Sequence, residues 1–245
     1  MKIGRGHNFL DYGIFAKQLI GLPQGSSLTI NTLNQYSYCI AEEDELYKEA
    51  LQHSDVLLPD GIGIVLAAWF LNGTKLKKIA GADVHCHFLD ELEKVSGSCF
   101  YLGSSDRTLK LIKKKMALRF PNIRVGSFSP PYRAAFSKAE NQQMVNAVND
   151  FAPDVLFVGM TAPKQEKWVH AHRDQLDVRV VCTIGAVFDF YAGVISRPGK
   201  LWINLGLEWL GRWLREPLRL SRRYLYYGPV FIFLMIKAKL KHEFS

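Results

Sequence analysis

The chain of 245 residues has few cysteines and no long apolar segment. Its four cysteines, at positions 39, 86, 99 and 182, match neither a zinc-binding pattern nor a redox motif, and we interpret them as reduced thiols. No window reaches about 18 uninterrupted apolar residues, so we expect no membrane-spanning helix. The first residues also lack the apolar stretch of a signal peptide, which predicts a location on the cytoplasmic side of the membrane.

The sequence also lacks the short motifs of common nucleotide and metal sites. It contains neither a Walker loop nor a complete Gly-x-Gly-x-x-Gly fingerprint, which argues against an NAD-dependent oxidoreductase or epimerase. No Asp-x-Asp motif is present to hold a metal on a sugar diphosphate. His85, Cys86 and His87 are adjacent, but residues at i and i+2 do not share a helical face, so they make a poor metal cluster.

Positive charge is concentrated near the C-terminus. The formal net charge is +8, and residues 195–245 hold ten lysines and arginines against three acidic residues. One interpretation is a solvated basic helix, but tryptophans, tyrosines and the apolar run 229–236 are interleaved with these cations. This combination is typical of a helix that lies on an anionic membrane surface. A tail that binds nucleic acid would rarely need such an apolar run, so we expect no nucleic-acid partner.

The remainder of the chain alternates between short apolar runs and segments with helical spacing. Strands are expected at 27–32, 55–58, 99–102, 123–126, 155–158 and 178–184, and helices at 35–52, 62–71, 82–95, 106–119, 137–151 and 163–175. This order predicts an α/β fold, a Rossmann-like parallel sheet covered by helices on both faces, with a C-terminal basic helical appendage. We place the catalytic core at residues 1–196 and the appendage at 197–245.

Polar residues follow several of the predicted strands at the point where each strand ends. They are Thr32, Asn34, Asp60, Lys164, Gln165 and Asp189, and Gly61, Gly103 and Pro163 belong to the same strand-end segments. In an open parallel sheet, ligands bind at the carboxyl ends of the strands. We therefore expect these residues to gather around one site.

Each of these residues also has a purely structural interpretation. Asp60 is either the N-cap of the following helix or a general base at the mouth of the site. The loop after Gly103 either holds a phosphate on backbone N–H groups or is capped by Ser105 or Asp106. Lys164 and Gln165 fit the first turn of a surface helix, and Asp189 fits a buried cap as well as a ligand contact.

Several segments, taken together, resemble one family of enzymes. They are Leu58-Pro59-Asp60-Gly61-Ile62-Gly63, Gly81-Ala82-Asp83, Tyr101-Leu102-Gly103, Ala162-Pro163-Lys164-Gln165-Glu166-Lys167-Trp168, Gly185-Ala186-Val187-Phe188-Asp189, and Leu207-Glu208-Trp209-Leu210 followed by Arg212, Arg215, Arg219, Arg222 and Arg223. Over residues 29–224 they resemble the WecG/TagA/CpsF family, glycosyltransferase family 26. Thr161 departs from the pattern, because many relatives have glycine there, and the first residues match poorly.

The resemblance implies an inverting, metal-independent glycosyltransferase that needs no cofactor. Its donor would be a UDP-sugar, with N-acetylmannosamine or another hexose as the sugar. Its acceptor would be a polyprenyl-diphosphate-linked sugar used in cell-surface polysaccharide synthesis. The enzyme would lie peripherally on the inner face of the cell membrane, with a homo-oligomer as one option. A non-enzymatic membrane- or RNA-binding α/β module remains the main alternative from the residues alone.

The resemblance also implies roles for individual residues. Asp60 would be the general base, and Thr32 and Asn34 would orient the acceptor or sugar hydroxyls. Gln165 would hold the donor, with Gly61, Pro163 and Lys164 beside it. The tail residues Arg212, Arg219 and Arg222 would fold over the site and neutralise the diphosphate. Gly103 and Asp189 are assigned to the nucleotide.

Overall fold

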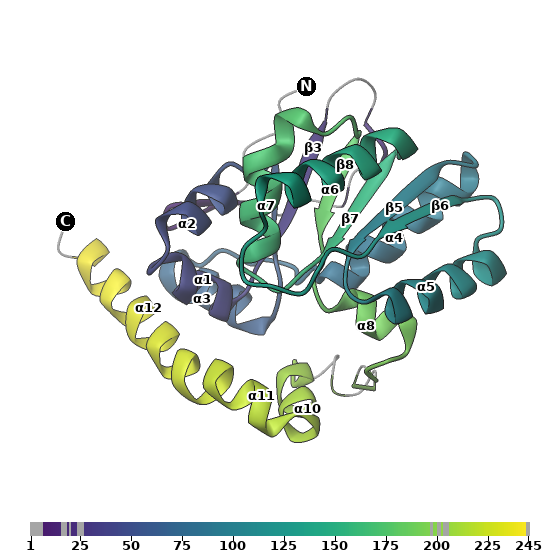
Figure 1. Cartoon of the computed structure of the whole chain (residues 1–245). Helices are drawn as coiled ribbons and strands as arrows, with labels where there is room; N and C mark the ends of the chain where they lie inside the picture. The colour runs from purple at the N-terminus through teal and green to yellow at the C-terminus, as the bar shows by residue number, and fades with distance from the viewer. Residues whose placement is uncertain are drawn as a thin grey trace.

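The computed structural model describes residues 7–15, 19, 21–23, 27–196, 198–199, 202 and 206–243. These residues form an eight-stranded sheet in the order β1-β2-β4-β3-β8-β7-β5-β6, antiparallel between β1 and β2 and parallel throughout the rest (Figure 1). The strands are β1 (His7–Phe9), β2 (Tyr12–Ile14), β3 (Leu28–Leu33), β4 (Val56–Pro59), β5 (Ser98–Gly103), β6 (Arg124–Phe128), β7 (Val155–Gly159) and β8 (Val180–Thr183).

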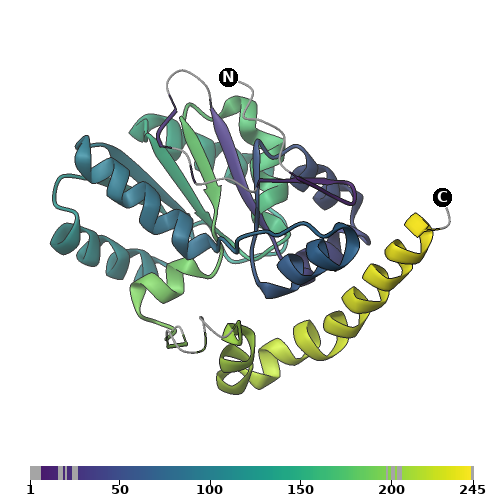
Figure 2. The ribbon, with the colours of Figure 1, turned by 180° about the vertical axis from the view of Figure 1, so that it is seen from behind.

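Helices cover both faces of this sheet, as the sequence predicts (Figures 1 and 2). The helices of the α/β body are α1 (Gln35–Ala41), α2 (Glu45–Gln52), α3 (Ile62–Asn72), α4 (Gly81–Lys94), α5 (Asp106–Arg119), α6 (Lys138–Phe151), α7 (Lys164–His172) and α8 (Val187–Ala192). Along β5, Tyr101 packs with residues of α4, α5 and α8, whereas Phe100 and Leu102 pack with residues of α6 and α7. The central strands are therefore buried on both sides, which explains their continuous apolar sequences.

The tail is helical and packs back onto the body. It comprises α10 (Glu208–Arg215), α11 (Pro217–Ser221), a π-helical segment η2 (Arg222–Tyr226) and the long α12 (Tyr227–Glu243). Tyr227, Phe231 and Met235 lie at i, i+4 and i+8 on α12 and join a buried cluster with residues of α1, α2, α3 and the hairpin β1–β2. The chain thus returns from the far end of its sequence to the elements that follow β3 and β4.

Four segments differ from the sequence prediction. The hairpin β1–β2 lies in a region for which we predicted no structure. The helix expected over 35–52 is broken into α1 and α2, because the Asp44 side chain accepts the N–H of Tyr47 and caps a new helix. The segment 173–175 continues α7 as a 3₁₀ turn, and the predicted strand-end loop around Asp189 is the short helix α8.

Other sequence interpretations concern the cysteines and the membrane. Cys39, Cys99 and Cys182 are buried, as expected for core thiols, and Cys86 is exposed. Within the part of the chain that the structure describes, no helix combines the length and apolar character needed to cross a membrane. Arg197, at the predicted boundary between core and appendage, lies outside the described residues.

Candidate functional site

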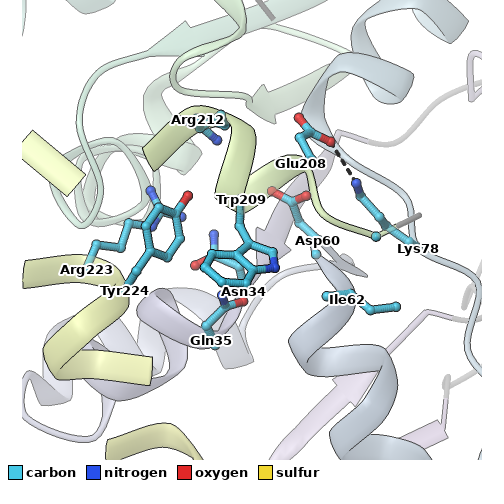
Figure 3. Close-up of a pocket in the computed structure, with 12 residues that line it drawn as sticks. Asn34, Gln35, Asp60, Ile62, Lys78, Glu208, Trp209, Arg212, Arg223 and Tyr224 are labelled. Carbon is cyan, nitrogen blue, oxygen red and sulfur yellow. Dashed lines mark hydrogen bonds and ion pairs between the residues drawn. The ribbon is translucent and has the colours of Figure 1, made fainter. Parts of the chain in front are cut away.

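A small cavity lies between the carboxyl ends of β3 and β4 and the tail (Figure 3). Its volume is about 60 Å³. The lining residues are Asn34, Gln35, Asp60, Gly61, Ile62 and Lys78 from the body, and Gly206, Glu208, Trp209, Arg212, Arg223 and Tyr224 from the tail. The site therefore combines residues that are far apart in the sequence; Lys78 and Glu208, for example, are 130 positions apart.

Backbone pairing in the sheet places Asp60 in this cavity. Strand β4 ends where Pro59 pairs with Leu33, and the N–H of Asp60 donates to the carbonyl of Leu33 at 2.8 Å. Helix α3 starts after Gly61, which is its N-cap and has a φ of +95°, a region that only glycine adopts readily. The N-cap interpretation of Asp60 is therefore wrong, and its carboxylate is left to face the cavity.

The surroundings of Asp60 raise its pKa above the ordinary value of an aspartate. Burial is the main cause, and the nearby carboxylate of Glu208 acts in the same direction. The cations Lys78, Arg223 and Arg212 oppose this effect. Among the described residues, none of the three cations forms an ion pair with Asp60. A carboxylate with a raised pKa and no ion pair is well suited to accept a proton.

The tail contributes two guanidinium groups and a second acid. The Arg212 guanidinium lies 5.2 Å from the ring centre of Phe190, and that of Arg223 lies 5.0 Å from the ring centre of Tyr36. The buried Nε atoms of both arginines have no hydrogen-bond partner within the described part of the chain. Buried N–H donors without acceptors are costly, so this end of the cavity favours an anionic ligand such as a phosphate.

Glu208, the first residue of α10, holds the tail against the body. Its Oε2 atom lies 2.8 Å from the Nζ atom of Lys78, and the side chains are 15% and 23% exposed. Trp209 follows it and also lines the cavity (Figure 3). The ion pair joins the tail to the segment that follows α3.

Asn34 serves both the fold and the site. Its Oδ1 atom accepts the N–H groups of Tyr36 and Ser37 at 3.1 and 3.0 Å and so caps α1. The amide Nδ2 is then the end of the side chain that is left to meet a ligand in the cavity. Thr32, two residues earlier, is partly exposed on β3 but does not line the cavity.

Gln165 is buried near the ends of β7 and β8, away from the cavity lining. Its Oε1 atom accepts the N–H of Met160 at 3.2 Å, and its Nε2 atom donates to Glu166 at 2.9 Å. Lys164 donates to the carbonyl of Arg133 and lies 3.7 Å from the ring centre of Phe136. Neither these residues nor Pro163, the N-cap of α7, lines the cavity.

The loop after β5 has a structural explanation. A Cβ on Gly103, whose φ is +116°, would lie 2.5 Å from the carbonyl oxygen of Gly159, so only glycine fits between these strand ends. The Ser105 hydroxyl accepts the N–H of Thr108, as expected of a helix cap. The assignment of Gly103 to a nucleotide stays a prediction.

The remaining predicted residues lie outside the lining. Burial raises the pKa of Asp189, and the charge of Arg219 opposes this shift. Arg219 forms an ion pair with Glu216 at 2.5 Å, and Arg222 is exposed. Of the three arginines expected at the site, only Arg212 lines it, and Arg223 takes the place predicted for Arg222.

Sequence reasoning missed further members of the lining. Glu208, Trp209 and Arg223 fall inside the tail motifs that carry the family resemblance, so a signal was present but no role was assigned to them. Lys78 had no signal, because it lies in an irregular segment between α3 and α4. A search of the described residues for three or more metal-binding side chains close together finds no such group.

The sequence has recognisable relatives. Residues 14–245 match the profile described as the glycosyl transferase WecG/TagA/CpsF family. An N-acetylglucosaminyldiphosphoundecaprenol N-acetyl-beta-D-mannosaminyltransferase of Bacillus subtilis (strain 168) is 29% identical over 215 residues, 88% of this chain and 80% of that protein. A protein of the same name from Staphylococcus aureus (strain MW2) is 28% identical over 220 residues, 88% of this chain and 82% of its own length.

Proposed function

The chain belongs to the WecG/TagA/CpsF family of glycosyl transferases, and from this premise we propose that it transfers N-acetylmannosamine or a related hexose from a UDP-sugar to a polyprenyl-diphosphate-linked sugar. Relatives that are 27–29% identical are named for this kind of transfer to N-acetylglucosaminyldiphosphoundecaprenol. The family assignment contradicts the two alternatives, an NAD-dependent oxidoreductase and a non-enzymatic binding module. The observation that carries the proposal is the Asp60 carboxylate, which has no ion pair among the described residues and lines the cavity with Arg212 and Arg223.

We propose a single displacement without a metal. An acceptor hydroxyl oxygen attacks the anomeric carbon while its proton passes to the Asp60 carboxylate. The bond between the anomeric carbon and the diphosphate oxygen breaks, and UDP departs with the electron pair. The guanidinium groups of Arg212 and Arg223 neutralise the charge that develops on the diphosphate. One displacement inverts the anomeric configuration and forms no sugar–enzyme bond.

The size of the cavity supports a tail that opens and closes. At about 60 Å³ the cavity is several times smaller than the roughly 300–1,000 Å³ of typical ligand pockets. A nucleotide-sugar fits only if α10 and η2 move away from Asp60. Closure after binding would bring the arginines to the diphosphate and exclude water, which limits hydrolysis of the donor.

The experiment that tests this function measures UDP release with a panel of UDP-sugars and a synthetic lipid-diphosphate acceptor, with and without EDTA. Asp60→Asn should lower kcat by about 10²-fold or more with little change in donor binding, because the amide cannot accept the proton. Asp90→Asn, exposed on α4, is the matched control and should keep wild-type turnover. Undiminished turnover of Asp60→Asn removes this residue as the base, and loss of activity with EDTA contradicts metal independence.

We also propose that the tail docks the enzyme on an anionic membrane surface. The outer face of α12 carries four exposed apolar side chains, Ile232, Phe233, Ile236 and Leu240, opposite the side that packs on the body. We refer to these four residues as the outer apolar face. Exposed Lys237 borders it. An apolar stripe that no part of the described chain covers, bordered by a cation, supports contact with the lipid surface that holds the acceptor.

A further inference from the structure

The cavity contains a second carboxylate that the proposed reaction does not use. Glu208 lines the cavity with Asp60, and its ion pair with Lys78 crosses from tail to body (Figure 3). Two partly buried carboxylates near one ammonium group compete for it. In the structure, Lys78 is paired with Glu208 rather than with Asp60.

A backbone hydrogen bond within the body, independent of the tail residues, places Lys78 near Asp60. The N–H of Ile79 donates to the carbonyl of Pro59 at 3.0 Å, which ties the residue after Lys78 to the residue before Asp60. Of the four charged groups that act on Asp60, namely Lys78, Arg223, Glu208 and Arg212, Lys78 and Glu208 form the ion pair. Among the residues that line the cavity, the acids are Asp60 and Glu208, so Asp60 is the acid of the lining that remains for Lys78 when Glu208 is removed.

We propose that Glu208 is a positioning residue that holds the Lys78 ammonium away from Asp60 and so leaves the Asp60 carboxylate free to accept a proton. When α10 lifts off the body, Lys78 pairs with Asp60 and occupies the base. Tail docking would thus switch the base on as well as close the site. This inference rests on the proposed function, because it takes Asp60 to be the base.

The physical consequence is a change in base strength. An aspartate paired with a cation has a pKa about 1–3 units lower than the unpaired group, and its ion pair must break before the acceptor hydroxyl can approach. Both effects slow proton abstraction. Less donor would also be hydrolysed while the tail is away from the body, because the base that would activate water is occupied.

The first experiment compares two variants of the whole 245-residue chain with wild type in the transfer assay. Glu208→Gln should lower kcat about tenfold or more, because the freed Lys78 occupies Asp60. It should also move the acidic limb of the pH profile of kcat/KM to lower pH, since the loss of the Glu208 charge and the approach of Lys78 both lower the pKa of Asp60. Adding Lys78→Met to this variant should recover most of the lost kcat, because no ammonium remains to occupy Asp60.

The controls distinguish this mechanism from simple tethering. If the ion pair only fastened the tail, the double variant Lys78→Met/Glu208→Gln would be as slow as Glu208→Gln, and that result overturns the proposal. The matched control is the exposed ion pair of Lys94 and Glu91 on α4, at 2.6 Å. The double variant Lys94→Met/Glu91→Gln should leave kcat and the pH profile unchanged.

A second experiment does not depend on activity. A crystal structure of Glu208→Gln should place the Lys78 Nζ atom within about 4 Å of the Asp60 carboxylate, the usual limit for an ion pair. A Lys78 side chain that stays away from Asp60 overturns the inference even if transfer is confirmed. Conversely, a Lys78–Asp60 pair in a protein without transferase activity would refute the proposed function and keep the positional role of Glu208.

Discussion

Glu166 shows how strongly burial acts on a single carboxyl group in this chain. Only 3% of the residue is exposed, and burial raises its pKa to about 7. Its Oε1 atom accepts the Nε2 hydrogen of Gln165, while its Oε2 atom has no partner within the described residues. Near neutral pH the folded protein therefore holds this side chain partly protonated, in contact with a residue that the family resemblance assigns to donor binding.

This environment predicts a pH-dependent stability. The folded-state pKa of Glu166 lies above its unfolded value of 4.5, so its contribution is full below about pH 4.5 and is lost as the pH rises through 7. Glu166→Gln should remove this loss, raising the free energy of unfolding above pH 7 by about 3 kcal/mol relative to wild type. Chemical denaturation at a series of pH values from about 4 to 8.5, a range that brackets both pKa values, measures the difference. Parallel curves of unfolding free energy against pH for the two proteins would contradict the prediction.

At the level of single residues, the sequence predicted part of the cavity lining but not all of it. Asp60, Gly61, Asn34 and Arg212 were predicted and line the cavity. Lys78 could not be predicted as part of the site. It lies in an irregular segment, which has no sequence periodicity from which to infer the side of the molecule that a side chain faces. Gln165 was predicted to hold the donor at the carboxyl ends of the strands. It does lie near those ends, but its side-chain hydrogen bonds to Met160 and Glu166 hold it in the interior.

At the level of elements, α1 illustrates how a cap and a binding group share one side chain. Asn34→Ala removes the Oδ1 acceptor and should lower the free energy of unfolding by about 1 kcal/mol. Asn34→Ser keeps a cap oxygen but loses the amide, so stability should stay near wild type while KM for a substrate rises. Thermal denaturation combined with steady-state kinetics separates the two roles. Equal stability of the Ala and Ser variants would show that the cap contributes nothing.

The helices of the tail determine which arginines line the cavity, namely Arg212 and Arg223. The family resemblance assigned Arg212, Arg219 and Arg222 to the site. In the structure the chain restarts at Pro217 as α11 and then passes through the π-helical segment η2. In this arrangement Arg223 lines the cavity and Arg222 is exposed. Such a local change of helix type has no sequence signal.

On the scale of the whole molecule, the tail has two unlike surfaces. Tyr227, Phe231 and Met235 belong to the buried core shared with α1 and α3, whereas the outer apolar face of α12 points away from it. The sequence predicted a helical appendage with apolar and basic character. It could not predict which apolar side chains pack on the body, because the run 229–236 is apolar around the whole helix and therefore has no periodicity to read.

The outer apolar face leads to a prediction about membrane binding. Ile232→Ser/Phe233→Ser replaces side chains that are 60% and 65% exposed, so the fold should be retained. Each substitution removes about 1–2 kcal/mol of favourable apolar contact with lipid. The double variant should therefore partition onto vesicles with anionic lipid about tenfold or more weakly than wild type. Vesicle co-sedimentation measures this, and binding of wild type should fall as salt rises because cations contribute. Leu118→Ser, which is 77% exposed on the basic helix α5, is a stringent control. If Leu118→Ser weakens binding as much as the double variant, the membrane contact does not lie on α12.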